Sequence, residues 1–220
     1  MQCRNTPIGK ETNMYFSIII PAHNEENNIM KALESIRIQS FQNYEVIVVC
    51  DACTDNTHAV AQTYGARVID VDFHSPGASR NAGLDIAQGK WVLFMDADDW
   101  YLHEYVLEQL RRHLGDNRAD VVLFAIIWKH IGYGPIKNKD GKYFTHVANK
   151  CWRRSSIGNT RFPTVRPAED AVFWERMVER GIVIDEWDMP LYYYNYLRKG
   201  STSDQLGRTA EHTKQYWGLP

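Results

Sequence analysis

Short apolar runs alternate with amphipathic segments over the first hundred residues of the chain. Each run is bounded by polar or turn-forming residues, which predicts strands at 16–21, 44–50, 67–71 and 91–95. Apolar residues recur at helical spacing between these runs, which predicts helices at 27–38, 54–64 and 78–87. Thr54 is the expected cap of the second helix. Strands that alternate with helices indicate βαβ units and a mainly parallel sheet.

The second half of the chain has a less regular pattern. Its clearest segments predict helices at 102–114 and 169–180 and a strand at 120–128. The interval 130–159 is expected to be mostly loop, with a hairpin turn at Asp140-Gly141. Two short apolar runs, 182–185 and 191–196, are expected to form edge strands.

Composition narrows the class of protein. The 220 residues are 44% hydrophobic and 24% charged, as in an ordinary globular chain. We expect one α/β domain over residues 14–203, with halves at 14–101 and 102–203, followed by a tail at 204–220. The net charge of −2 offers no basic field for nucleic acid, which is therefore not expected as a partner. No apolar run is long enough to span a bilayer, and four cysteines are too few for a disulfide scaffold, so we expect a cytoplasmic location.

Polar residues follow the predicted strands where a parallel sheet binds its ligands, beyond the carboxyl ends. The first strand is followed by residues 21–26, the second by Asp51, and the fourth by Asp96, Asp98 and Asp99. Clustered carboxylates repel one another without a cation, and oxygen ligands suit Mg²⁺ or Mn²⁺ bound to a diphosphate. The alternative is a solvated turn in which Asp99 caps the next helix. Spacing alone leaves both open, because Asp70-Val71-Asp72 repeats the pattern.

The order of four motifs resembles the family-2 glycosyltransferases of GT-A fold. The motifs are Pro21-Ala22-His23-Asn24-Glu25, Asp51-Ala52-Cys53-Thr54-Asp55-Asn56-Thr57, Arg80-Asn81-Ala82-Gly83 and Asp96-Ala97-Asp98-Asp99. The resemblance is close over residues 15–101 and looser to Ser203. It implies a Rossmann-like, mainly parallel sheet flanked by helices, with a nucleotide-binding half and an acceptor half. It also implies an inverting transferase that moves a sugar from a nucleotide-diphosphate sugar, usually a UDP-sugar, to a saccharide or lipid-linked acceptor.

The same resemblance implies roles for individual residues. Asp98 would bind the metal, Mn²⁺ or Mg²⁺. Asp170, which stands in an acidic pair with Glu169, would act as the general base. The resemblance also implies donor-binding roles for Pro21, His23 and Glu25, for Asp51 at the nucleotide base and for Arg80 near the phosphates. Asp96 would lie near the ribose or sugar, and Arg198 or Lys199 at the leaving diphosphate. A base at a helix N-terminus stays ionised because the helix dipole favours negative charge there. Acidic residues are also common in first helical turns without any catalytic role.

The chain departs from the family pattern at the second strand. Similar proteins have Asp-Asp-Gly-Ser where this chain has Cys50-Asp51-Ala52-Cys53, and His23 replaces a more usual Tyr. One pair of cysteines cannot complete a tetrahedral zinc site, and Cys3 and Cys151 have no matching spacing. The departures leave alternatives: a nucleotide-binding module without transferase activity, a nucleotidyltransferase, or a thiol oxidoreductase that uses Cys50 and Cys53.

A basic stretch precedes the acidic pair, and the tail carries Tyr216 and Trp217. The stretch is either solvated surface or a site for an anionic acceptor such as a lipid-linked diphosphate; its residues are Lys150, Arg153, Arg154, Arg161 and Arg166. A lipid-linked acceptor would place the protein peripherally at the inner face of a membrane. The tail is expected to dock on the domain or on a partner.

Overall fold

The computed structural model describes residues 14–138, 140–164, 168–198, 207 and 209–217. The strands are β1 (Phe16–Ala22), β2 (Tyr44–Asp51), β3 (Arg67–Val71), β4 (Trp91–Phe94), β5 (Trp100–Tyr101), β6 (Val121–Trp128), β7 (Gly132–Gly134), β8 (Lys150–Arg153) and β9 (Ile184–Tyr194). The helices are α1 (Ile29–Arg37), α2 (Thr57–Thr63), α3 (Pro76–Ile86), α4 (Val106–Leu114), α5 (Arg154–Ile157), α6 (Glu169–Glu179) and α8 (Ala210–Trp217), with a 3₁₀ turn at Val147–Asn149.

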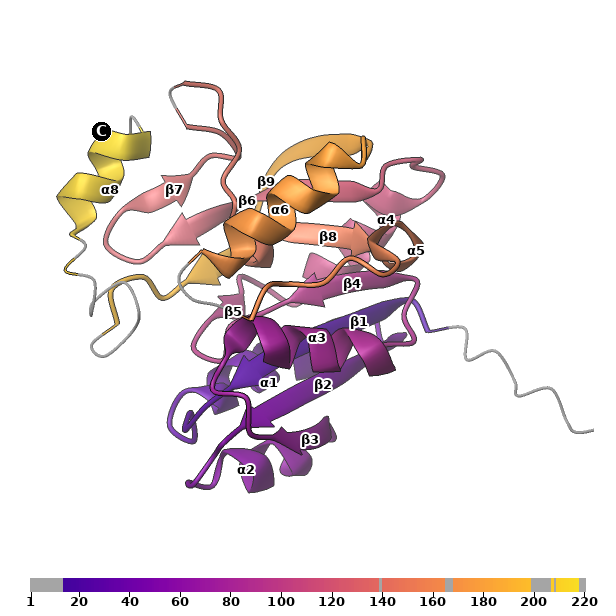
Figure 1. Ribbon diagram of the computed structural model, residues 1–220, viewed down its shortest axis with the longest axis vertical. Helices are drawn as coiled ribbons and strands as arrows, with labels where there is room; N and C mark the ends of the chain where they lie inside the picture. The colour runs from indigo at the N-terminus through magenta and orange to yellow at the C-terminus, as the bar shows by residue number, and fades with distance from the viewer. Residues whose placement is uncertain (1–13, 139, 165–167, 199–206, 208, 218–220) are drawn as a thin grey trace, which may run out of the picture.

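The described strands form one mixed sheet, with the order β3-β2-β1-β4-β8-β6-β9-β5 and β7 paired to β6 (Figure 1). β1 is parallel to both β2 and β4, and β2 is parallel to β3. These four strands are joined through α1, α2 and α3, because parallel neighbours need a crossover connection. The predicted Rossmann-like, mainly parallel sheet of the first half is thus confirmed.

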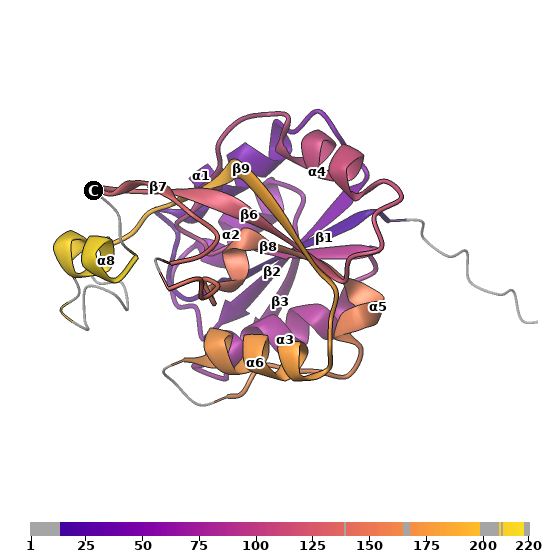
Figure 2. The same ribbon diagram turned by 90° about the horizontal axis from the view of Figure 1, so that it is seen from above.

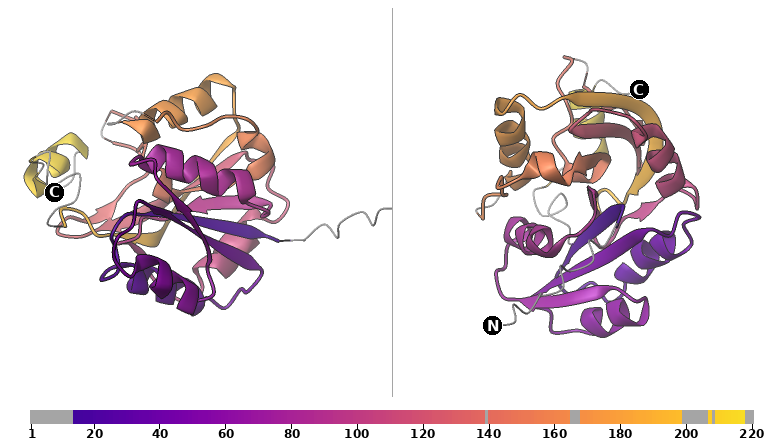
Figure 3. Two further views of the ribbon diagram at one scale, coloured as in Figure 1. Left: turned by 60° about the horizontal axis from the view of Figure 1, so that its bottom comes forward. Right: turned by 90° about the vertical axis from the view of Figure 1, so that its right-hand side faces the viewer.

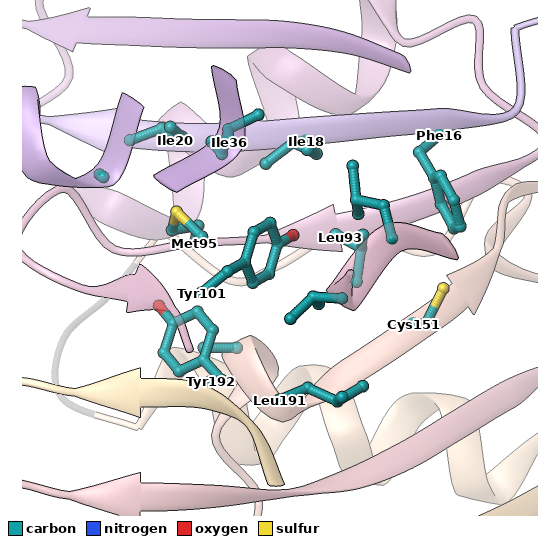
Figure 4. Packing of buried hydrophobic residues seen from close by; sticks show 14 of the residues in the cluster. Phe16, Ile18, Ile20, Ile36, Leu93, Met95, Tyr101, Cys151, Leu191 and Tyr192 are labelled. Atoms are coloured by element: carbon teal, nitrogen blue, oxygen red, sulfur yellow. The ribbon is translucent and has the colours of Figure 1, made fainter. Parts of the chain in front are cut away.

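Helices cover both faces of the sheet (Figure 3). Alternate residues of β1 divide between two cores: Ile18 and Ile20 pack with α1, α2 and α4, whereas Ile19 packs with α3, α5 and α6. Figure 4 shows the first core, where Ile18 and Ile20 lie near Ile36 of α1. Burial of both faces explains why the strand reads as a continuous apolar run and not as an alternating one.

Two local expectations are corrected by the structure. α2 begins at Thr57, and its first N–H groups are served by Asp55, whose Oδ1 accepts the Thr57 N–H at 3.0 Å, so Thr54 is not the cap. Residues 182–185 and 191–196 do not form two edge strands. Most of both runs belongs to one strand, β9, which lies between β6 and β5 and shifts register opposite Ala125.

The interval expected to be loop contains a central strand. β8 lies antiparallel between β4 and β6, where it joins the two halves of the sheet. Its sequence gave no strand signal because it is only four residues long and begins and ends with a basic residue. The turn predicted at Asp140-Gly141 is confirmed by the antiparallel bridge between Lys137 and Tyr143 and by the positive φ of Gly141. α8 in the tail lies outside both helix layers (Figure 2), and the side chains of Tyr216 and Trp217 lie outside the described residues.

Gly83 allows α3 to approach β1 closely. A Cβ at this position would lie 2.4 Å from Cγ2 of Ile19, which is fully buried. Glycine normally weakens a helix relative to alanine by about 1 kcal/mol, so its presence here reflects packing.

We therefore predict that Gly83→Ala lowers the free energy of unfolding by about 1–3 kcal/mol, the usual cost of overpacking a core. Denaturant titration followed by circular dichroism measures the change. Adding Ile19→Ala to the variant should make the Gly83→Ala substitution less costly by removing the clashing methyl group. A gain in stability from Gly83→Ala alone, as helix propensity would give, contradicts the packing argument.

Candidate active site

The loops that follow β1, β2 and β4 meet at one rim of the sheet. His23, after β1, has its Nδ1 2.6 Å from the backbone oxygen of Asp51 at the end of β2. The backbone N–H of Glu25 donates to Thr57 Oγ1 at 2.8 Å, which ties the same loop to α2. Pro21 lies one residue before the end of β1 and is partly exposed. The residues predicted around the nucleotide are therefore neighbours in space.

Asp51 anchors the loop that leads into α3. Its Oδ1 accepts the N–H groups of Phe73 and His74, and its Oδ2 accepts the Ser75 N–H and the Ser79 hydroxyl, all at 2.7–2.9 Å. Burial alone would raise the pKa of Asp51, but these four donors outweigh it and the pKa is lowered. A carboxylate offers about four acceptor positions, so a hydrogen bond from the base, which stays a prediction, would replace one already formed.

A buried arginine gathers acidic groups from both halves of the chain. Arg80 of α3, which is 5% exposed, places Nη2 2.9 Å from Asp96 Oδ1 and Nη1 3.4 Å from Asp170 Oδ1. Glu169 Oε1 lies 3.8 Å from the same Nη1. Burial raises the pKa of Asp96, but the charges of Arg80 and His146 outweigh it, so the pKa of Asp96 is lowered. Arg80 therefore fixes the N-terminus of α6 against the end of β4.

Asp98 pairs with a different arginine. Arg198 Nε lies 2.6 Å from Asp98 Oδ2, and its Nη2 lies 2.7 Å from Glu25 Oε1. Burial raises the pKa of Asp98, the nearby Asp96 raises it further, and Arg198 only partly offsets both effects. The Asp98 carboxylate therefore sits in a negative and poorly solvated place, where additional positive charge stabilises its ionised form. Lys199, the other basic residue predicted here, lies outside the described residues.

Asp99 belongs neither to a metal site nor to a helix cap. It is fully buried and accepts hydrogen bonds from the Tyr192 hydroxyl at 2.7 Å and the Asn195 N–H at 2.8 Å. The strand β5, and not a helix, follows it. The three carboxylates of the motif thus have three different sets of partners, and a metal-binding role of Asp98 stays a prediction.

The sequence did not identify His146 as part of the site, and it placed Lys150 in a basic stretch without showing that its side chain is buried. His146 Nε2 lies 3.5 Å from Asp96 Oδ2, and its ring stacks on Phe144. Lys150 is fully buried and donates to the carbonyls of Phe144 and His146 and to Asn149 Oδ1, at 2.6–2.8 Å. Burial lowers the pKa of Lys150 to about 7. A lysine in an unpatterned segment gave no signal that it would fold inward and hold the loop carrying His146.

The interpretation of the basic stretch as solvated surface is wrong for Lys150, whereas Arg154 is exposed as that interpretation expects. Lys150 is buried, and Arg153 donates to the carbonyls of Ala119 and Asn117. Arg154 donates to Gly89 O, and Arg161 pairs with Asp85. These groups hold the chain together and are already partnered. Arg166 lies outside the described residues.

The two cysteines near the rim do not form a disulfide. Cys50 is buried, and the Cys53 thiol donates to the Ala22 carbonyl at 3.4 Å. Burial raises the pKa of the Cys50 thiol, whereas redox-active cysteines have lowered values. This disfavours the oxidoreductase interpretation.

A mainly parallel sheet with acidic side chains gathered at the ends of its strands defines an α/β protein with a ligand site at that rim. The chain belongs to glycosyl transferase family 2, whose model matches residues 17–171. Its fold is the GT-A fold.

Two relatives and two solved structures place the chain within this fold. It is 35% identical over 207 residues to the putative glycosyltransferase EpsH of Bacillus subtilis, with 81% of this chain and 60% of EpsH covered. The poly(ribitol-phosphate) β-N-acetylglucosaminyltransferase TarS of Staphylococcus aureus is 33% identical over 121 residues, or 51% of this chain and 21% of TarS. The structure of TarS 1–349 in complex with UDP-GlcNAc matches with a TM-score of 0.75 at 26% identity and covers 87% of this chain and 61% of that one. A mannosyltransferase from Pyrobaculum calidifontis, at 18% identity and a TM-score of 0.70, shares the fold and covers 93% of this chain and 63% of that one.

The chain spans only part of its relatives, about 60% of the length of EpsH and 21% of TarS. In the described part of the chain, no helix has both the length and the hydrophobicity needed to cross a bilayer.

We predict that Asp51→Asn lowers the free energy of unfolding at neutral pH by about 1–3 kcal/mol. The NH₂ group of the asparagine side chain would face N–H and O–H groups that now donate to the carboxylate, and it cannot accept their hydrogen bonds. Folding lowers the pKa of Asp51, so its stabilisation is present above the unfolded value near about 4 and is lost as the pH falls through the folded value. The variant should lose that part of the acid dependence in denaturant titrations across pH.

The matched control is Asp72→Asn, since the Asp72 side chain is 82% exposed and contacts only the surface residue His74 by an ion pair. It should change stability by less than about 0.5 kcal/mol. Equal losses in the two variants would show that Asp51 does not anchor the loop.

Proposed function

We propose that the chain is an inverting glycosyltransferase that transfers a sugar from a UDP-sugar to a hydroxyl of a saccharide or lipid-linked acceptor. The observation that carries the proposal is the meeting of Asp98 and Asp170 at one rim. Asp170, which opens α6, lies 3.4 Å from Arg80 Nη1, and the same guanidinium pairs with Asp96, which stands two residues before Asp98. A leaving diphosphate and an attacking hydroxyl need such groups on opposite sides of the reacting carbon.

The identity of the donor base is supported by likeness to TarS. That protein's structure contains UDP-GlcNAc, and it shares 26% identity with 87% of this chain. We infer a uridine nucleotide for this chain as well. His23 and Pro21 lie beside Asp51 at the end of the sheet where the base is expected, and the ring of His74 lies 6.2 Å from that of His23.

The residues at the rim fit a divalent cation, Mn²⁺ or Mg²⁺. Asp98 is an oxygen donor whose burial and proximity to Asp96 favour a cation. One or two carboxylates together with substrate phosphates form a usual Mg²⁺ site, so Asp98 suffices as the principal protein ligand. A bound metal would supply charge neutralisation for the departing diphosphate.

Asp170 is the proposed general base. Its Oδ2 accepts the Val147 N–H at 3.3 Å, which orients the carboxylate. Its Oδ1 is buried without a hydrogen-bond partner among the described residues, while Arg80 Nη1 lies 3.4 Å away. The neighbouring side chains would have to move for an acceptor hydroxyl to reach this buried oxygen. The hydroxyl would then give up its proton to Asp170 as the hydroxyl oxygen attacks the anomeric carbon from the face opposite the diphosphate.

Arg198 is proposed to exchange partners during donor binding. In the structure its guanidinium bridges Asp98 and Glu25, with two contacts of 2.6 and 2.7 Å. Its side chain is 27% exposed, so it has room to move. Released from Asp98, it would donate to the diphosphate oxygens, where positive charge stabilises the transition state.

The acceptor is proposed from the names of relatives. TarS is described as acting on poly(ribitol-phosphate), which supports a cell-surface polymer as the acceptor class here. We propose a cytoplasmic protein that meets a lipid-linked acceptor peripherally at the inner face of the membrane. A nucleotide-binding module without transfer remains the second candidate, favoured by Cys50 and Ala52 where the family has Asp and Gly. A nucleotidyltransferase is disfavoured because the loop after β1 carries the acidic residues Glu25 and Glu26.

We predict that Asp98→Asn abolishes the Mn²⁺-dependent part of UDP binding measured by calorimetry. Arg198→Ala should strengthen binding of Mn²⁺ alone by roughly two- to tenfold, since a half-buried ion pair that competes for Asp98 is worth on the order of 1 kcal/mol. The same variant should slow sugar transfer. Arg37→Ala, in an exposed ion pair on α1, is the control and should change neither affinity. Unchanged UDP affinity in Asp98→Asn would remove Asp98 from the metal site.

We predict that Asp170→Asn keeps UDP-sugar affinity within about twofold but lowers the turnover rate by about 10²–10⁴-fold, the usual contribution of a general base. Glu175→Gln, on an exposed position of the same helix, should retain full activity. Product formation from a panel of UDP-sugars with a saccharide acceptor measures the rate. Donor binding without turnover in the unmodified protein, across donors and acceptors, would favour the binding-module interpretation.

A further inference from the structure

A second group of metal-ligating side chains lies on the other side of β2 from Asp51. Cys50 of β2, His58 of α2 and Asp70 of β3 place a sulfur, an imidazole nitrogen and a carboxylate oxygen within 4.8 Å of one another. In the ranges that the structure describes, this is the one group of three such donors found that close together. None of the three takes part in the proposed transfer reaction.

The backbone holds the three residues in register. Cys50 and Asp70 are direct partners in the parallel pairing of β2 with β3, so their side chains leave the sheet on the same face. α2 covers that face, and His58 in its first turn places Nδ1 2.7 Å from Asp70 Oδ1. The cluster thus rests on two strands and one helix and not on a mobile loop.

The three side chains of the cluster differ in burial, from one in the core to one that is largely exposed to solvent. Cys50 is 1% exposed, whereas the side chains of His58 and Asp70 are 34% and 65% exposed. The sulfur lies at the bottom and the carboxylate at the mouth, which gives an ion a path from solvent. The raised pKa of Cys50 keeps it a neutral thiol without metal, so the cluster does not hold an unpaired buried thiolate.

We propose that Cys50, His58 and Asp70 form a binding site for Zn²⁺ or a similar borderline-soft divalent ion, distinct from the Mn²⁺ or Mg²⁺ position at Asp98. One thiolate, one imidazole and one carboxylate are ligands that zinc accepts, whereas Mg²⁺ and Mn²⁺ prefer oxygen alone. On binding, the ion displaces the Cys50 thiol proton to solvent and takes the place of the His58–Asp70 hydrogen bond. His58 then ligates through Nδ1 and carries its proton on Nε2.

The fourth position of a tetrahedral ion is open to water. The Cys53 thiol, which also interacts with that of Cys50, is the nearest further sulfur in the motif. The ion would link α2 and β3 to β2 at the residue next to Asp51. Asp51 in turn anchors the loop 73–75. Its effect would therefore be on the stability of the edge of the sheet below the proposed base site.

The test uses the full chain, stripped with a chelator and titrated with Co²⁺ and with Zn²⁺ alone. We expect one Co²⁺ per chain with a sulfur-to-cobalt charge-transfer absorption band, displacement of Co²⁺ by Zn²⁺, and a rise in melting temperature with Zn²⁺. Cys50→Ser should remove the band. His58→Gln and Asp70→Asn, which change partly exposed side chains and so test the site even if Cys50→Ser folds poorly, should weaken Zn²⁺ binding by at least roughly tenfold.

The chain offers a matched control in His74 and Asp72. Their side chains form a similar pair at 2.9 Å, are 69% and 82% exposed, and do not belong to the cluster of three donors. His74→Gln and Asp72→Asn should leave Zn²⁺ affinity unchanged, and so should Asp98→Asn. A sulfur-to-cobalt band that survives in Cys50→Ser, or equal losses in the control pair, would overturn the proposal.

Discussion

The site depends on one buried cation, Arg80. Its guanidinium is held in the interior by Asp96 from the end of β4 and by Asp170 and Glu169 from the start of α6. Burial lowers the pKa of an arginine, but the three carboxylates more than offset this, and the pKa of Arg80 is raised. Breaking such a buried group of charges costs on the order of 3–5 kcal/mol, so the two halves of the chain are fixed to each other through it.

The same electrostatic argument explains why Asp98 differs from its neighbours. Arg80 compensates Asp96, and the Tyr192 hydroxyl and Asn195 N–H serve Asp99. Asp98 is left with Arg198, a side chain long enough and exposed enough to move. The environment of the three aspartates, and not the motif alone, is therefore why Asp98 is the one proposed to bind the metal.

Cys50 at the end of β2 and Cys53 in the loop after it have different surroundings. Cys50 faces α2 beside Asp70, while the thiol of Cys53 donates to Ala22. Their spacing resembles that of a redox pair, yet Cys50 lies in the core with a raised pKa. The proposed metal-binding role of Cys50 depends on His58 and Asp70. These residues stand 8 and 20 residues further along the chain, and the β2–β3 pairing brings Asp70 beside Cys50.

The sequence by itself determined the βαβ order of the first half, because each buried parallel strand needs a continuous apolar run and each crossover an amphipathic helix. It also determined which motifs stand at the ends of the strands, since Pro21, Asp51 and Asp96 follow apolar runs directly. Only the tertiary structure decided the rest. β8, buried Lys150 and His146 carry no periodic signal, and their positions come from pairing across the sheet. The partners of Asp51, Asp98 and Asp99 are likewise set by chain segments 22 to 100 residues away, where long-range packing and not local pattern determines the contacts.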